Sequence, residues 1–216
     1  MSVRVAINGF GRIGRNILRA IIENDNKNIN VVGINDLGPV STNAHLLKYD
    51  TIHGKLNKEV IVSENGIDVG YGSIKVTSIR EPEKLPWDEL NVDVVLECTG
   101  LFASKEKAEL HLKAGAKKVL VSAPASGADI TVVYGVNHTK ITKDHKIISN
   151  ASCTTNCLAP IAFVLNDAIG IENGFMTTIH SYTGDQPTLD TMHSDLYRSR
   201  AAAGNMIPTS TGAAKA

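Results

Sequence analysis

The chain has 216 residues, of which 43% are apolar and 5% aromatic, and its 22 basic residues balance 22 acidic ones. This apolar content can form a hydrophobic core, whereas zero formal charge gives no attraction toward nucleic acid or an anionic membrane. No apolar stretch is long enough to span a bilayer, and the N-terminus shows no signal-peptide pattern. We therefore expect a globular protein of the cytoplasm that binds neither nucleic acid nor membrane.

The chain contains three cysteines, Cys98, Cys153 and Cys157. An odd number of cysteines in a chain of this length favours reduced thiols over a disulfide framework. Cys153 and Cys157 are four residues apart and could hold a metal on one helix face. No histidine or further cysteine stands nearby to complete four ligands, so we expect no metal site.

Apolar runs typical of strands alternate with helical patterns through the first 150 residues. The predicted strands are residues 3–8, 31–35, 92–98, 117–121, 130–134 and 146–149, and the predicted helices are 11–23 and 105–114. Continuous apolar strands between amphipathic helices are typical of a doubly wound parallel sheet buried on both faces. Residues 59–79, with turn signals at 65–66 and 70–72, predict an antiparallel meander inserted into this α/β pattern.

The pattern changes after residue 155. Residues 156–168 predict a helix with Pro160 near its start, and residues 174–183 predict a strand. Residues 183–207 form a long polar stretch, which is usually functional or disordered, and another helix begins near residue 211. We predict a Rossmann-type domain over residues 1–150 and, over 151–216, the beginning of an incomplete α+β catalytic domain in a truncated chain.

Residues 9–14 read Gly-Phe-Gly-Arg-Ile-Gly and lie between a predicted strand and a predicted helix. In this context Gly9 allows the turn, Gly11 lets the backbone approach a pyrophosphate, and Gly14 lets helix and strand pack closely. The helix N-terminus adds unpaired N–H donors. Asp36, 22 positions beyond Gly14, would accept hydrogen bonds from the ribose hydroxyls and repel a 2′-phosphate. The combination predicts a dinucleotide site.

Two later strand ends belong to the same edge of the predicted sheet. Glu97-Cys98-Thr99-Gly100 and Ser122-Ala123-Pro124 follow predicted parallel strands. Because sheets of this kind bind ligands at the carboxyl ends of their strands, we expect Thr99, Gly100 and Ser122 to contact the cofactor.

Cys153 follows an apolar strand-like run and precedes helix-capping residues. A thiol there faces the positive end of a helix dipole, which favours the thiolate. A thiol nucleophile also needs a base, and His180 is the best of seven histidines because it lies near a strand end that leads into the polar stretch. Considered singly, Cys153 could be an inert thiol and His180 a structural histidine; together with a nucleotide site they predict a redox enzyme.

Three blocks of the sequence resemble the phosphorylating glyceraldehyde-3-phosphate dehydrogenase family. Residues 6–15 read Ala-Ile-Asn-Gly-Phe-Gly-Arg-Ile-Gly-Arg, and residues 149–157 read Ser-Asn-Ala-Ser-Cys-Thr-Thr-Asn-Cys. Residues 207–216 read Ile-Pro-Thr-Ser-Thr-Gly-Ala-Ala-Lys-Ala. The similarity runs essentially from residue 1 to residue 216.

The resemblance implies a two-domain fold, a cytosolic homotetramer and NAD-dependent conversion of D-glyceraldehyde 3-phosphate and inorganic phosphate to 1,3-bisphosphoglycerate. Cys153 would form a hemithioacetal and then a thioester, with His180 as the base. The family pattern places the cofactor on Gly9, Gly11, Arg12, Ile13, Gly14, Asp36, Arg80, Thr99, Gly100 and Ser122. It places the substrate and attacking phosphates on Ser152, Thr154, Thr183, Arg198, Thr211 and Gly212.

The chain departs from the family in length and in one loop. Family chains are about half as long again, so we expect these 216 residues alone to show no dehydrogenase turnover. Residues 190–193 read Asp-Thr-Met-His where NAD-specific bacterial members carry Leu-Pro at the middle two positions. Asp36 followed by Leu37 favours NAD, while dual use of NAD and NADP stays open.

Two other functions remain possible from the sequence. Erythrose-4-phosphate dehydrogenases share the thiol and the histidine, but they tend to carry Glu at position 36 and His at position 123, where this chain has Asp36 and Ala123. A non-catalytic nucleotide-binding scaffold could use the same fold, because fold alone does not fix function. Rapid, selective alkylation of Cys153 would favour the enzyme over the scaffold.

Overall fold

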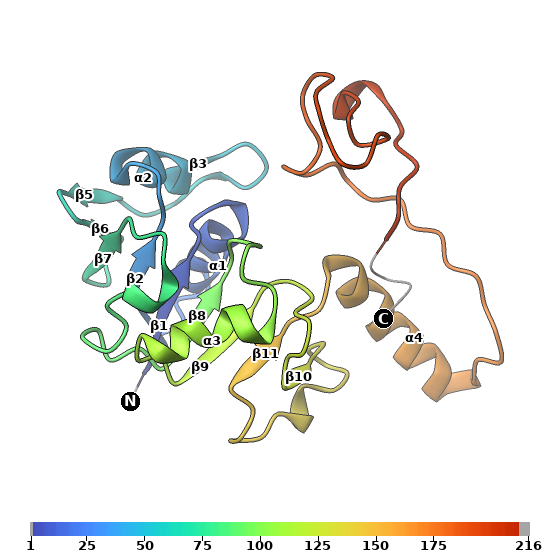
Figure 1. Cartoon of the computed structure of the whole chain (residues 1–216), viewed down its shortest axis with the longest axis horizontal. Coiled ribbons are helices and arrows are strands. Elements are labelled where there is room, and N and C mark those ends of the chain that lie inside the picture. The colour runs from blue at the N-terminus through green and yellow to red at the C-terminus, as the bar shows by residue number, and fades with distance from the viewer. Residues whose placement is uncertain (1, 212–216) are drawn as a thin grey trace. The chain divides into compact units, whose positions relative to one another are not determined.

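The computed structural model describes residues 2–211 of the chain. The chain divides into two compact units, Met1–Ala151 and Ser152–Ala216, which we describe separately. The first unit is a mostly parallel α/β sheet with helices packed on it, which confirms the predicted fold class (Figure 1).

The strands of the main sheet run in the order β10-β11-β9-β8-β1-β2-β7-β6-β5. Every neighbouring pair from β10 to β7 is parallel, whereas β5 and β6, and β6 and β7, pair antiparallel. The bounds are β1 (Val3–Asn8), β2 (Ile29–Asn35), β5 (Ile61–Ser63), β6 (Gly66–Asp68), β7 (Ser73–Thr77), β8 (Val94–Glu97), β9 (Lys118–Val121), β10 (Ile130–Thr131) and β11 (Ile147–Ser149). A separate ribbon consists of β3 (Tyr49–Asp50) and β4 (Gly54–Lys55).

The helices of the first unit cover both faces of the sheet. They are α1 (Arg12–Glu23), α2 (Val40–Lys48) and α3 (Lys105–Lys113), with two short 3₁₀ turns, Pro82–Lys84 and His138–Lys140. Successive residues of β1 point to opposite faces, so Ile7 joins the core with α1 and α2 while Ala6 joins the core with α3. Both cores consist mainly of aliphatic side chains, which agrees with the continuous apolar strands of the sequence.

Most of the predicted elements of this unit are present, with three differences. The antiparallel meander of β5, β6 and β7 is confirmed, and β7 also pairs parallel with β2, so the meander extends the main sheet. The predicted strand at 130–134 keeps only Ile130–Thr131. Helix α2 was not predicted, because the polar residues Ser41, Thr42 and Asn43 interrupt its apolar periodicity. The β3–β4 ribbon was not predicted, because each of its strands has only two residues.

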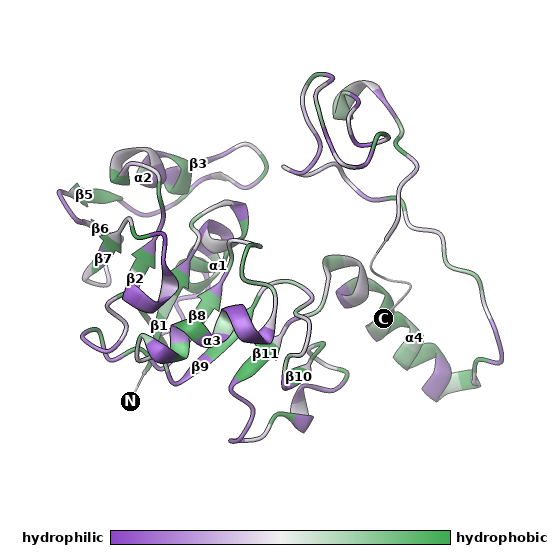
Figure 2. Ribbon diagram, viewed as in Figure 1, coloured by the Kyte–Doolittle hydropathy of each residue, from purple (hydrophilic) through white to green (hydrophobic). Residues whose placement is uncertain are grey.

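The second unit contains helix α4 (Cys153–Ile169) and a 3₁₀ turn, Ala202–Gly204. Helix α4 begins three residues before the predicted start, because the Ser152 hydroxyl accepts a hydrogen bond from the Thr155 amide (2.9 Å) and caps it there. None of its residues is buried, and Ile161, Phe163 and Val164 are exposed. Figure 2 shows this helix as a largely hydrophobic ribbon.

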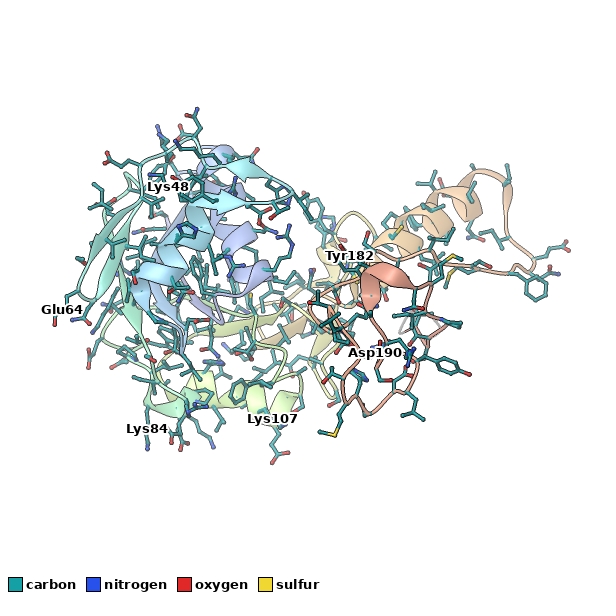
Figure 3. All side chains as sticks on the ribbon, turned by 90° about the horizontal axis from the view of Figure 1, so that it is seen from above. Lys48, Glu64, Lys84, Lys107, Tyr182 and Asp190 are labelled. Carbon is teal, nitrogen blue, oxygen red and sulfur yellow. The ribbon has the colours of Figure 1, made fainter. Side chains whose placement is uncertain are left out.

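The predicted strand at 174–183 is wrong, since these residues have no regular secondary structure. Their β-branched residues fit a pleated surface, but a strand forms only where a second strand satisfies its backbone groups. The described part of the second unit contains no strand that could pair with this segment. The polar stretch 183–207 contains turns and bends, with a bend at Asp190 (Figure 3). The predicted helix from residue 211 lies almost wholly outside the described residues.

Candidate active site

The glycine turn joins β1 to α1 in the first unit. Gly9 has a φ of +89°, which L side chains rarely adopt, and a Cβ added there would lie 2.7 Å from the Thr99 amide nitrogen. A Cβ on Gly14 would collide with the Gly9 carbonyl oxygen, so the helix can approach the strand only with glycine at position 14. A Cβ on Gly11 would meet nothing within 4 Å, which leaves the space over the turn open.

A cleft of about 350 Å³ opens at the carboxyl ends of the parallel strands, beside this turn. It is lined by Asn8, Gly9, Gly11, Asn35, Asp36, Leu37, Ile79, Arg80, Cys98, Thr99, Leu101 and Phe102. Five of the predicted cofactor residues therefore line this cleft: Gly9, Gly11, Asp36, Arg80 and Thr99. The location agrees with the rule that open α/β sheets bind ligands outside the carboxyl ends of their strands.

Asp36 follows β2 and links the second strand to the glycine turn. One carboxylate oxygen accepts a hydrogen bond from the Phe10 amide (2.8 Å), and the other accepts from the Gly38 amide (2.8 Å) and the Asn43 side chain (3.2 Å). These donors fix the orientation of the carboxylate. Its remaining lone pairs can accept hydrogen bonds from vicinal ribose hydroxyls.

Arg12 and Ile13 begin helix α1, where the first N–H groups have no helical acceptors. The Arg12 guanidinium contacts the Asp50 carboxylate at 2.8 Å, although sequence reasoning did not single out Asp50. Hydrogen bonds from Arg12 and from the His53 amide hold the pKa of Asp50 well below its ordinary value. Ile13 is 50% exposed. Free amides and a cation beside open space suit a pyrophosphate.

The other predicted cofactor residues lie at the ends of β8 and β9. Gly100 has a φ of +75°, so the chain can turn away directly after Thr99. Ser122 lies beyond β9, and its amide donates to the Glu97 carbonyl (3.0 Å). Arg12, Ile13, Gly14, Gly100 and Ser122 do not line the cleft.

The predicted nucleophile and base contact each other within the second unit. The Cys153 Sγ lies 3.2 Å from His180 Nε2, and His180 Nδ1 lies 2.6 Å from the Ser181 carbonyl oxygen. Because a carbonyl can only accept, Nδ1 carries a hydrogen and Nε2 faces the sulfur. This arrangement is that of a thiol beside its base.

The contact between Cys153 and His180 changes the pKa of each group in the direction that favours its charged form. The hydrogen bond from His180 lowers the pKa of Cys153, outweighing a partial burial that raises it. The hydrogen bond to Cys153, followed by the one to Ser181, raises the pKa of His180. The contact therefore favours the thiolate of Cys153 and the imidazolium of His180 over the neutral forms of the pair.

The local sequence sets the position of Cys153. Ala151, between β11 and α4 in the chain, adopts a φ of +56°, which is uncommon for a residue with a side chain. Ser152 caps the helix, so Cys153 is its first residue. The helix dipole there adds to the stabilisation of the thiolate, and a hydrogen bond from Thr154 also lowers the pKa of Cys153.

Some of the predicted phosphate residues form a second cluster. Arg198 donates to Thr209 Oγ1 (2.8 Å), to Asp185 (2.7 Å) and to the Ser210 carbonyl (3.3 Å). These contacts join Arg198 to the segment before Thr211 and to the turn that contains Thr183. Thr211 itself is half-buried, and Gly212 lies outside the described residues. Asp185 and Asp195 both lie within 4 Å of the guanidinium, so its charge is already paired.

Sequence reasoning missed several residues of the first-unit cleft. Asn8 and Asn35 end two parallel strands, and their position at strand ends was the available signal. Cys98 also lines the cleft, where burial raises its pKa to about 11 and makes it an inert thiol. Phe102 and Leu101 carried no pattern that distinguishes them from ordinary loop residues.

Within residues 2–211, no cluster of three or more His, Cys, Asp or Glu side chains is arranged to hold a metal ion. No helix in the same part of the chain has the length and apolar character needed to cross a membrane.

Two family models match the chain. Residues 3–105 match "Glyceraldehyde 3-phosphate dehydrogenase, NAD binding domain", and residues 152–216 match "Glyceraldehyde 3-phosphate dehydrogenase, C-terminal domain". The chain belongs to the glyceraldehyde-3-phosphate dehydrogenase family. The cleft beside the glycine turn lies in the part that matches the NAD-binding domain, and Cys153 and His180 lie in the part that matches the C-terminal domain.

Curated relatives of high similarity are also named glyceraldehyde-3-phosphate dehydrogenase. The chain is 71% identical over 216 residues to the glyceraldehyde-3-phosphate dehydrogenase of Xanthobacter flavus and 67% identical over 216 residues to that of Cereibacter sphaeroides. It is 59% identical over 214 residues to glyceraldehyde-3-phosphate dehydrogenase 1 of Bacillus cereus. The aligned regions cover 99–100% of this chain and 64% of each relative. The chain thus spans slightly less than two thirds of the length of these relatives.

Proposed function

We propose that the protein is an NAD-dependent, phosphorylating glyceraldehyde-3-phosphate dehydrogenase that converts glyceraldehyde 3-phosphate and inorganic phosphate to 1,3-bisphosphoglycerate. The observation that carries the proposal is the 3.2 Å contact between Cys153 and His180 at the start of a helix. The glycine turn and its cleft in the first unit, together with the names of the relatives, support NAD as the cofactor.

The Cys153–His180 pair can begin the reaction. The thiolate adds to the aldehyde carbon and forms a tetrahedral hemithioacetal oxyanion, which an imidazolium at His180 stabilises by hydrogen bonding or proton donation. His180 as a neutral imidazole then takes the hydroxyl proton of the hemithioacetal. Removal of this proton leaves an electron pair on the hemithioacetal oxygen, and that electron pair forms the thioester carbonyl as the hydride leaves the carbon.

The cofactor, when bound, supplies the acceptor for the hydride of that C–H bond. The carbon then stays attached to Cys153 as a thioester, whose attack by phosphate releases the acyl phosphate and restores the thiolate. In this proposal Ser152, Thr154, Thr211 and Gly212 hold the attacking phosphate, and Thr183 and Arg198 serve the phosphate sites. Hydroxyl donors and a guanidinium are the groups that recognise a dianion.

The residues present in the first unit fit a dinucleotide. The space over Gly11 is open, the first amides of α1 have no acceptors within the helix, and the Phe10 amide of the turn holds the Asp36 carboxylate. We assign the pyrophosphate to Gly9, Gly11, Arg12, Ile13 and Gly14, the ribose to Asp36, the adenine end to Arg80 and further contacts to Thr99, Gly100 and Ser122. We also propose a homotetramer in the cytoplasm.

Phosphate dependence tests this function in the intact protein. With NAD and glyceraldehyde 3-phosphate but no inorganic phosphate, we expect a burst of reduced cofactor close to one equivalent per chain. Added phosphate should convert the burst to steady turnover, because it removes the thioester. Steady turnover at the same rate without phosphate, or a higher kcat/KM for erythrose 4-phosphate, would overturn the proposal.

A further inference from the structure

A buried polar network lies directly behind the cleft of the first unit. The side chains of Glu97, His111 and Trp87 are 0–1% exposed, and Asn8 and Asn35 are 2% and 5% exposed. The proposed chemistry uses neither Glu97 nor His111. Because isolated charges are costly in a protein interior, a buried carboxylate requires a complete set of partners.

Four donors converge on the Glu97 carboxylate. One oxygen accepts from Asn8 Nδ2 (2.7 Å) and faces His111 Nε2 (2.9 Å), and the other accepts from the Thr99 amide (2.8 Å) and the Thr99 hydroxyl. Burial disfavours the charged form, but the hydrogen bonds from His111, Asn8 and Thr99 outweigh it and hold the pKa of Glu97 below its ordinary value.

The direction of these hydrogen bonds is fixed at the helix end of the network. Trp87 Nε1 can only donate, and it lies 3.0 Å from His111 Nδ1. Nδ1 must therefore carry a lone pair, which leaves the hydrogen of a neutral imidazole on Nε2, directed at Glu97. The tautomer of His111 thus follows from the tryptophan.

The direction of the hydrogen bonds is also fixed at the other end of the network, at Asn35. Asn35 Oδ1 accepts from the Ile79 amide (2.9 Å), and Asn35 Nδ2 donates to the Ile79 carbonyl (2.9 Å), so the Asn35 amide cannot rotate by 180° without losing both bonds. Asn35 Nδ2 also donates to Asn8 Oδ1 (2.8 Å), which directs Asn8 Nδ2 at Glu97. Both ends of the network therefore send donors toward its centre.

The position at the centre of the network, occupied by the Glu97 carboxylate, can hold only a hydrogen-bond acceptor. On the side of the cleft, Thr99 donates the remaining hydrogen bonds to this carboxylate. Thr99 lines the cleft, and its amide nitrogen is the atom that a Cβ on Gly9 would meet at 2.7 Å. The position of Thr99 thus controls the wall on which the glycine turn packs. Asn8, the second contact of the carboxylate, lines the same cleft.

We propose that Glu97 is a positioning residue for the cofactor: its carboxylate, held from the core by His111 and Asn8, fixes Thr99 against the glycine turn. The inference rests on the proposed binding of NAD in this cleft. Glu97 itself does not line the cleft and acts through Thr99.

Glu97→Gln tests this assignment because the network predicts which contact fails. The amide oxygen of the glutamine must face His111 and Asn8, whose donors cannot turn away. Its NH2 group then points at Thr99: the Thr99 hydroxyl can rotate and accept from it, but the Thr99 amide faces a donor and loses its acceptor. The substitution should therefore displace the cleft wall while the hydrogen bonds on the core side persist.

The measurement is NAD binding and steady-state kinetics of the intact protein. We expect Glu97→Gln to raise the Kd and KM for NAD about tenfold, since an unsatisfied buried donor usually costs this much, and to change kcat by less than about twofold. Hydrogen–deuterium exchange should rise in the peptide containing Thr99 but not in the peptide containing Trp87. Glu106→Gln, an exposed change on α3, is the matched control and should leave all values unchanged.

The possible results separate the two proposals. If the unaltered protein binds no NAD, the proposed function is overturned, and this inference with it. If the unaltered protein binds NAD and Glu97→Gln binds it within twofold, or loses kcat at constant KM, the inference alone is overturned. Should Glu97→Gln not fold, Thr99→Val removes the hydroxyl from the other side of the contact; an unchanged Kd for NAD in that variant would likewise contradict the inference.

Discussion

At the scale of single residues, three features of the structure favour the thiolate of Cys153. Its position at the start of α4, the hydrogen bond from His180 and the hydrogen bond from Thr154 all stabilise the thiolate. Cys98 has the opposite environment, since burial raises its pKa to about 11. The thiolate is therefore favoured at position 153 and disfavoured at position 98.

The first prediction concerns selectivity among thiols. With a limiting amount of iodoacetamide at neutral pH, Cys153 should be alkylated at least tenfold faster than Cys98, because only the thiolate reacts. Peptide mass spectrometry of the intact protein measures both rates. Equal, slow labelling of the two residues would indicate the scaffold and not the enzyme.

The second prediction concerns pH. His180 lowers the pKa of Cys153, so the alkylation rate should stay high below the usual thiol range and fall only as the pH drops through the lowered pKa. In His180→Gln this contribution is lost, and the midpoint of the rate–pH curve should move to higher pH. The control is His53→Gln, a change at an exposed histidine of the first unit, which should leave the midpoint unchanged. A midpoint unaffected by His180→Gln would refute the pairing.

The residues of the nucleotide site show what could be predicted from the sequence at this scale. Gly9, Gly11 and Asp36 could be predicted from their spacing, because few residue types can perform the backbone and ribose functions that we propose for them. Asp50 and Asn35 could not be found that way. Their roles depend on partners 38 and 44 residues away along the chain, which only the folded structure brings into contact.

At the scale of elements, we expect the glycine turn to require glycine at positions 9 and 11 for two different physical reasons. Gly9 needs its φ of +89° and has the Thr99 backbone in the way of a side chain, whereas Gly11 has an ordinary φ of −69° and open space. The fold thus requires Gly9, and the ligand would require Gly11.

The third prediction compares the two alanine variants. Gly9→Ala should destabilise the protein by roughly 1–3 kcal/mol, from backbone strain and the contact with Thr99. Gly11→Ala should cost less than about 1 kcal/mol, yet weaken NAD binding about tenfold or more, because its methyl group occupies space assigned to the pyrophosphate. Chemical denaturation and NAD titration measure the two effects. Unchanged affinity in Gly11→Ala would place the cofactor elsewhere.

The elements of the first unit were mostly predictable because its strands and helices have strong periodicity. The prediction of a strand at 174–183 was wrong, because a strand forms only when its backbone pairs with a second strand. The β-propensity of a segment does not show whether such a partner is present. Helix α4 was predicted, but its start was misplaced by three residues, because the cap at Ser152 outweighs the weaker pattern of the residues around it.

At the scale of the whole molecule, burial is distributed unequally between the two units. The first unit contains two cores, one on each face of its sheet. In the second unit Ala202 is the one described apolar residue that is buried, and the apolar side chains of α4 are exposed. Large exposed apolar surfaces of this kind usually mark interaction sites.

The fourth prediction follows from this difference. In the 216-residue chain, amides of β1 and β8 should exchange with deuterium slowly, because they lie in the centre of the sheet, whereas residues 171–183 should exchange within seconds. Peptide-resolved exchange measures both regions in one experiment. Slow exchange across 174–183 would show that this segment pairs as a strand after all.

The central claim is that Cys153 becomes covalently acylated beside its base. The direct measurement is mass spectrometry of the intact protein, quenched in acid after mixing with NAD and glyceraldehyde 3-phosphate in the absence of inorganic phosphate. We predict one phosphoglyceroyl group per chain on the Cys153 peptide, lost when phosphate is added and absent in Cys153→Ala. Reduced cofactor formed without any acyl group on Cys153, or undiminished turnover of Cys153→Ala, would contradict the account.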